Sequence, residues 1–154
     1  MMEMAKPRAE HGFLQKMVGR WDVTSQMSAG KPWVEDVRSI HGMWVIAEGN
    51  GEMPDGNGQA TTILTLGFDA AKGKYVGSWL GSMMDYLWVY EGDVEPDGNT
   101  LSLYTTGPAM DGSGLAEYRE QIIFLSEDHR LFNSSAKQPD GSWKQFMEAH
   151  YSRL

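Results

Sequence analysis

Cysteine is absent from this chain of 154 residues, and basic residues are fewer than acidic ones. Without cysteine the protein has no disulfide bonds, no thiolate nucleophile and no Cys-based metal site. Thirteen Lys and Arg against 21 Asp and Glu give a net charge of −8. Such a charge disfavours binding to phosphate backbones and to anionic membrane surfaces. We therefore expect neither nucleic acid nor a membrane as a partner.

Targeting segments are also missing from the sequence. No apolar run approaches the ~18 residues of a membrane span. The first ten residues, MMEMAKPRAE, lack the apolar core and the cleavage site of a secretory signal. These observations predict a soluble, cytoplasmic protein. A chain of this length is expected to form one domain, which we place at residues 10–154, after a flexible N-terminus at residues 1–9.

The sequence predicts a single short helix. Within residues 10–18, Phe13, Leu14, Met17 and Val18 recur at helical spacing. Gly19 follows them, as a glycine commonly does at the C-terminal end of a helix. We expect this amphipathic helix to lie across one end of a sheet.

From Trp21 onward the apolar residues alternate with a period near two, which is typical of strands. Pro-Asp-Gly occurs at 54–56, 96–98 and 139–141, and each copy has the chemistry of a tight turn, as has Ala-Ala-Lys-Gly at 70–73. The most aromatic stretch, YVGSWLGSMMDYLWVYEG, reads as a central hairpin. The pattern predicts about ten strands, at 21–28, 33–41, 43–52, 60–68, 74–81, 86–93, 99–106, 115–125, 129–136 and 142–152.

Ten antiparallel strands leave two free edges unless the sheet closes, so we predict an all-β, up-and-down barrel. Charged residues indicate the outer face of four strands, because side chains alternate across a strand. The opposite, inner face is predicted to contain Glu35, Val37, Ser39, His41, Tyr75, Trp79, Tyr118, Glu120, Ile122, Phe124, Trp143, Gln145, Met147 and Tyr151. An interior of this kind is typical of ligand cavities, and a fully packed core explains it equally well.

An ordered set of motifs resembles a known family. Gly19-Arg20-Trp21 opens the first strand, much as Gly-x-Trp opens lipocalin-like barrels. Later motifs follow in order: Leu66-Gly67-Phe68-Asp69, Tyr75-Val76-Gly77-Ser78-Trp79, Gly81-Ser82-Met83, Tyr90-Glu91-Gly92 and His150-Tyr151-Ser152-Arg153. From about His11 to Arg153 the chain is similar to the bacterial family called domain of unknown function 1579, which looks calycin-like. The resemblance implies a barrel able to hold a small ligand and an inward Trp21. It implies no established activity and leaves any cofactor unknown.

The four histidines do not form a metal motif, since none lies in H-E-x-x-H or another paired spacing. We therefore expect no metal site. Nitrobindins, which are calycin-like barrels, hold haem through a histidine near the C-terminus. His150 is near the C-terminus here, but its parity with Lys144 and Glu148 places it on the outer face, which argues against haem.

Glu120 is the most informative single residue, because parity turns it inward between Tyr118 and Ile122. A buried carboxylate needs a partner, or its pKa rises. In one interpretation, a Tyr, Ser or Arg side chain inside the barrel is the hydrogen-bond partner of the Glu120 carboxylate. In the other, Glu120 orients a polar group of a ligand or acts as an acid–base group.

We predict a small-molecule-binding barrel with no catalytic residue and a hydrophobic or aromatic ligand that carries one or two polar groups. The predicted ligand contacts are Trp21, His41, Trp79, Trp88, Tyr118, Glu120 and Met147. Two alternatives stay open: an enzyme that uses Glu120 with His41, and a homodimeric interaction module built on Met83 and Met84.

Overall fold

The chain forms a closed antiparallel barrel, seen here in a computed structural model that describes residues 3–154. The helix α1 (Ala9–Gln15) comes first, and a short 3-10 helix, η1 (Gln26–Ser28), separates the first two strands. The strands are β1 (Gly19–Ser25), β2 (Trp33–Ile40), β3 (Trp44–Glu52), β4 (Gln59–Asp69), β5 (Lys74–Gly81), β6 (Trp88–Val94), β7 (Thr100–Pro108), β8 (Leu115–Ser126), β9 (His129–Lys137) and β10 (Trp143–Arg153). Each strand pairs with its sequence neighbours, and β10 pairs with β1. The predicted ten-strand barrel with one N-terminal helix is confirmed.

The predicted flexible segment at 1–9 includes Met1 and Met2, which lie outside the described residues. Residues 3–8 have no helix or strand, and α1 begins at Ala9. None of the helices in the described part of the chain has the length and apolar character needed to cross a membrane.

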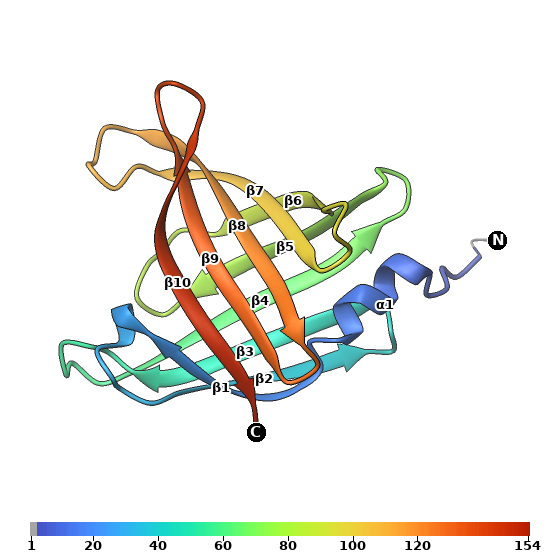
Figure 1. The fold of residues 1–154 in the computed structure, drawn as a ribbon, viewed down its shortest axis with the longest axis horizontal. Coiled ribbons are helices and arrows are strands. Elements are labelled where there is room, and N and C mark those ends of the chain that lie inside the picture. The colour runs from blue at the N-terminus through green and yellow to red at the C-terminus, as the bar shows by residue number, and fades with distance from the viewer. Residues whose placement is uncertain (1–2) are drawn as a thin grey trace.

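The connections alternate between the two ends of the barrel, and Figure 1 shows α1 at the end that carries the turns after β2 and β4. The Pro-Asp-Gly turns form as predicted: the amide of Gly56 donates to Met53, that of Gly98 to Glu95 and that of Gly141 to Gln138. In each, the Asp carboxylate accepts a hydrogen bond from the amide two residues later. We call the end beside α1 the closed end and the other the open end.

The closed half of the barrel is filled by apolar side chains. Phe13 and Leu14 of α1 and Met17 behind it are buried against inward residues of the strands, which include Val45, Leu66, Leu101 and Ile122. The edge of the Phe13 ring contacts Tyr75 and Phe124. The helix therefore closes one end of the barrel, as its apolar face predicts.

Trp21 and Arg153 fasten the first strand to the last at this closed end. The two residues are paired across β1 and β10, and the Arg153 guanidinium lies 4.2 Å from the centre of the Trp21 indole ring. Its nitrogen Nη1 donates to the Val18 carbonyl at 2.8 Å, and the indole N–H of Trp21 donates to Met17 at the same distance. Gly19 has a φ of +136°, and a side chain there would collide with the Arg153 guanidinium. This contact gives the Gly-x-Trp motif a physical reason.

A buried ion pair joins two opposite parts of the closed half. Arg130 of β9 is 1% exposed, and its guanidinium pairs with the carboxylate of Glu35 on β2. The same guanidinium lies over the rings of Trp21 and Tyr151, at 4.7 and 4.0 Å from their centres. The parity that turned Glu35 inward is therefore right, and the charge is accommodated by Arg130.

His41 does not lie on the inner face, which corrects the prediction for this residue. It is exposed in the turn between β2 and β3, where the Met43 amide donates to the Ile40 carbonyl. His41 and Gly42 both have positive φ, +51° and +78°, which is the requirement of a type I′ hairpin turn. The strand pattern ends before His41, because the turn takes this residue out of the alternation.

A β-bulge in β10 corrects the inner face predicted for Trp143 and Gln145. The register against β9 shifts between Gln145 and Met147, so that side chains before and after the bulge exchange faces. Trp143 contacts Tyr104 and the guanidinium of Arg119 on the outer face. Met147 pairs with the inward Ser134 and therefore faces inward, as predicted.

The open half of the wall has two seams. Pairing of β1 with β10 ends at Ser25 and Ala149, so residues 143–148 of β10 continue past the end of β1. On the other side, pairing of β6 with β7 ends at Glu91 and Tyr104. Figure 1 shows β8–β10 crossing β2–β4 at a wide angle. Within this one closed sheet, β1–β6 and β7–β10 form two parts, which we call the two sheets; at the two seams they are paired only toward the closed end.

Replacing Arg130 by Met should lower the free energy of unfolding by about 3–5 kcal/mol, because it leaves the Glu35 carboxylate buried without a counter-charge. The double variant Glu35→Gln/Arg130→Met should recover much of this loss. Arg20→Met is the matched control, since Arg20 and Asp36 form an exposed pair at 3.3 Å that is expected to contribute less than about 1 kcal/mol. Urea unfolding measures all three, and equal losses for Arg130→Met and Arg20→Met would contradict the role of the buried pair.

Candidate functional site

Three tryptophans of the open half lie on the inner face, each against a glycine. Trp33, Trp79 and Trp88 are half-buried, and their rings cover Gly51, Gly81 and Gly107. These glycines leave room for a ring to lie flat on the wall, an arrangement that also protects the exposed backbone. The result is an aromatic lining that stays partly accessible from the open end.

The aromatic lining continues across the β6–β7 seam. The ring of Trp88 makes edge contacts with Tyr86 and Tyr118 at centre distances of 5.0 and 5.4 Å, and Tyr118 contacts Phe146 of β10 at 6.1 Å. The hydroxyl of Tyr118 donates to the Pro108 carbonyl at 2.7 Å. The rings therefore connect the two sheets where the backbones separate.

Glu120 lies on the inner face beside this aromatic lining and is 8% exposed. Ser134 on β9 pairs with it across the sheet, and the serine hydroxyl donates a hydrogen bond to the carboxylate. Burial raises the pKa of Glu120 to about 7, and the hydrogen bond from Ser134 opposes this rise. The carboxyl group therefore changes its charge near neutral pH.

Two other polar side chains gather near Glu120 at the β6–β7 seam. Tyr90 of β6 and Thr105 of β7 are the next inner-face residues beyond the last paired ones. Burial raises the pKa of Tyr90, and the charge of Glu120 adds to this rise. The buried Thr105 hydroxyl has no hydrogen-bond partner among the described residues. A core that serves only packing needs neither this hydroxyl nor the Glu120 carboxyl.

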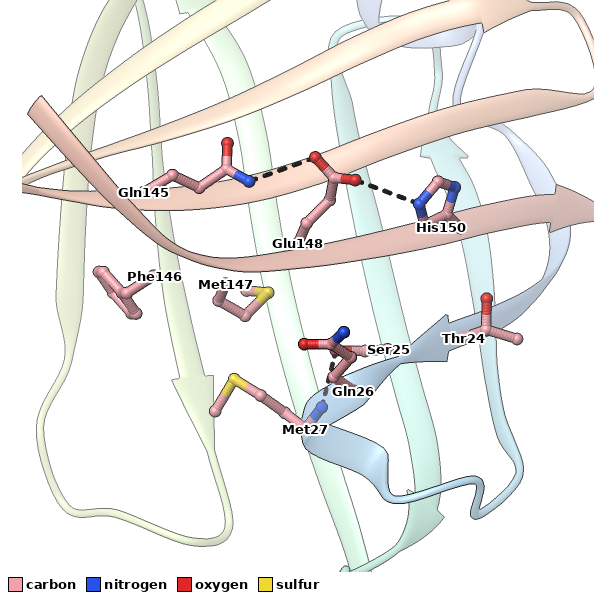
Figure 2. Close-up of a pocket in the computed structure, with 9 residues that line it drawn as sticks. All are labelled: Thr24, Ser25, Gln26, Met27, Gln145, Phe146, Met147, Glu148 and His150. Atoms are coloured by element: carbon pink, nitrogen blue, oxygen red, sulfur yellow. Dashed lines mark hydrogen bonds and ion pairs between the residues drawn. The ribbon is translucent and has the colours of Figure 1, made fainter.

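A groove of about 680 Å³ opens at the β1–β10 seam. Figure 2 shows Met27, Phe146 and Met147 at the gap between β10 and the segment that follows β1. Across the β10 ribbon, Glu148 accepts from the amide of Gln145 and contacts a ring nitrogen of His150 at 3.2 Å. Inner-face and outer-face residues line the same groove, so it lies at the edge of the wall.

A second hollow, of about 910 Å³, lies over the β6–β7 seam. Its lining combines the inner-face residues Tyr90, Thr105 and Tyr118 with outer-face residues such as Val89 and Trp143. Ion pairs flank it, with Lys72 3.7 Å from Glu91 and Lys137 3.4 Å from Glu117. Both hollows are therefore located where the two sheets part.

The structure brings together five of the seven predicted ligand contacts. Trp79, Trp88, Tyr118, Glu120 and Met147 lie on the inner face of the open half. Trp21 also faces inward but is completely buried at the closed end. His41 is exposed in its turn, so the pair of Glu120 with His41 that the enzyme alternative needs is not formed.

Sequence reasoning missed Trp33, Tyr90, Thr105 and Ser134. The parity set by Asp36 and Arg38 could have placed Trp33 inside, because it lies two residues before Glu35. The strand that contains Tyr90 has no clear outer face in its charge pattern. Thr105 and Ser134 are small polar residues without a sequence signal. Within the part of the chain that the structure describes, no three His, Asp or Glu side chains gather as a metal site.

The geometry defines a closed β-barrel with one filled end and one accessible, aromatic end. The chain belongs to the family described as protein of unknown function (DUF1579), whose model matches residues 6–153. No curated protein matches the chain. Among solved structures, the S-type phycobiliprotein lyase CPES from Guillardia theta is similar, with a TM-score of 0.54 and 18% identity. The match covers 95% of this chain and 92% of that one, and it shows a shared fold.

The stability of the protein should fall as pH rises through the range in which Glu120 ionises. Its pKa is about 7 in the folded state and 4.5 in the unfolded chain, so the folded state binds more protons between these values. The cost of ionisation grows from pH 4.5 upward and is complete above about pH 8, where it reaches roughly 3 kcal/mol. Glu120→Gln should remove this part of the pH dependence.

Urea unfolding between pH 5 and 8.5 measures the effect. Glu117→Gln is the control, because Glu117 is an exposed carboxylate on the outer face of the same strand. Parallel stability curves for the wild type and Glu120→Gln would show that Glu120 does not titrate in this range.

Proposed function

We propose that this protein binds a small, mostly apolar or aromatic molecule in the open half of its barrel. The observation that carries the proposal is Glu120, a buried carboxyl with one hydrogen-bond partner, placed beside half-buried aromatic rings. A core needs no such group, since burying a carboxyl in an apolar interior is costly. A ligand site needs a few polar groups that fix orientation among apolar ones.

The division of the barrel into two halves supports this site. The contacts that close the barrel, made by α1, Trp21 and the Arg130–Glu35 pair, lie in the closed half. The residues of the open half are not needed for these contacts. The two hollows at the seams lie beside this half of the barrel. A phycobiliprotein lyase shares the fold, but a shared fold does not fix the ligand, which depends on the residues of the site.

A screen of neutral aromatic molecules should find compounds that quench tryptophan fluorescence. Because Trp79 and Trp88 line the proposed site, Trp79→Phe and Trp88→Phe should reduce the quenching and weaken binding by about 1 kcal/mol each. Trp44→Phe is the matched control, since Trp44 covers Gly67 on the outer face and is 42% exposed. Quenching that depends on Trp44 and not on the inner residues would place the ligand outside the barrel.

The dimer alternative keeps one supporting observation, an apolar rim around the open end. Its residues are 40–70% exposed and come from η1, from the loops after β5 and β7 and from the first residue of β8: Met27, Met83, Met84, Leu87, Met110 and Leu115. Sedimentation of the wild type and of Met83→Ser/Met84→Ser tests it. We expect a dimer that the double variant dissociates if the rim joins two copies, and a monomer at all concentrations would remove this alternative.

A further inference from the structure

The charged inner-face residues of the two halves of the barrel differ in the partners that they have. In the closed half, Arg130 is paired with Glu35, and Arg153 is held by backbone carbonyls. In the open half, Glu120 lies beside the aromatic lining, and Lys144, opposite Ala136 in the register, is exposed at the rim. Glu120 accepts a hydrogen bond from Ser134, and none of the ion pairs among the described residues includes Glu120. An ionised Glu120 is therefore a buried anion without a counter-charge in the described residues.

The groups around Glu120 are aromatic rings, hydroxyls and the aliphatic side chain of Leu103. Tyr118 is two residues from Glu120 on the same strand, and the ring of Trp88 packs against the ring of Tyr118. Tyr90 lies across the seam, where its pKa responds to the charge of Glu120. On β7, Leu103 pairs with Glu120, and the unpartnered Thr105 hydroxyl is one inner position further along. From β9 the neighbour is Ser134.

This environment favours positive charge over negative charge. The faces of aromatic rings attract cations, most strongly where water is excluded. A buried carboxylate gains from a nearby positive charge, which offsets the cost of its desolvation. An anionic ligand would instead meet Glu120 as a repelling neighbour, with no buried cation to compensate. A neutral ligand would leave the carboxylate unpaired.

We propose that the open half of the barrel binds an organic cation, a flat or apolar molecule whose ammonium group pairs with Glu120 among the rings of Trp88, Tyr90 and Tyr118. This inference rests on the proposed function, because it names the chemical class of ligand for the same site. In this proposal Glu120 selects ligands that carry positive charge. The aromatic rings provide contact area for the apolar part and contact the cation with their faces.

Three naphthalene probes of one shape test the inference. They are (2-naphthylmethyl)trimethylammonium, its neutral carbon isostere 2-neopentylnaphthalene, and the anion 2-naphthylmethanesulfonate. The ammonium probe carries its charge at every pH, so any pH dependence of its binding belongs to the protein. Tryptophan quenching gives the Kd of each probe for the wild type, for Glu120→Gln and for the control Glu127→Gln, an exposed carboxylate between β8 and β9 at the closed end.

At pH 8 the cation should bind the wild type at least tenfold more tightly than the neutral isostere, and the anion should bind most weakly. Between pH 8 and pH 5 the cation should lose most of this preference, because the ionised fraction of Glu120 falls about tenfold for each pH unit below its pKa and a protonated Glu120 no longer attracts positive charge. The neutral probe should show little change. Glu120→Gln should abolish both the preference and the pH dependence while it retains neutral binding, and Glu127→Gln should behave as the wild type.

Equal binding of the cation and the neutral isostere by the wild type would overturn this inference and leave the proposed function standing. A cation preference that persists in Glu120→Gln would overturn it too, because another group would then select the charge. If none of the three probes binds, both this inference and the proposed site are wrong.

Discussion

The contact between Trp21 and Arg153 is the constraint on which the barrel depends, because it joins the first strand to the last. The guanidinium lies over the indole ring and donates to carbonyls at the end of α1, so the helix, β1 and β10 meet in one cluster. Gly19 is needed there for its positive φ and for the space beside Arg153. Closure at this end removes the free sheet edges that ten strands would otherwise expose.

Strand pairing around the barrel is complete near the closed end and incomplete at two seams in the open half. The Arg130–Glu35 pair and the apolar cluster beneath α1 hold the two sheets together in the closed half. Beyond Ser25 and Glu91 the backbones are no longer paired, and at the β6–β7 seam the ring of Trp88 packs against Tyr118 of β8. Contacts between rings adapt to a small displacement more easily than a strand ladder does. The wall is therefore joined least tightly at these two seams.

Two buried carboxylates have contrasting roles in this barrel. Glu35 has a guanidinium partner and belongs to the structure that closes the fold. Glu120 has a serine hydroxyl as its partner, which supports the charge less well than a cation would, and burial raises its pKa to about 7. The protein thus retains an unneutralised acid beside its aromatic lining, which is the property that our proposals on ligand binding explain.

The sequence by itself determined the fold class, the ten strands and the turn chemistry, because alternation and Pro-Asp-Gly turns are local properties of the chain. It also determined the inward orientation of Glu120, since charged neighbours fix the parity of an unbroken strand. Tertiary structure alone decided where parity fails, at the His41 turn and at the bulge before Met147. It alone decided that Arg130 neutralises Glu35 while Glu120 stays without a cation, because the partner of an inward side chain depends on barrel register. Register joins strands far apart in sequence, and no local pattern encodes it.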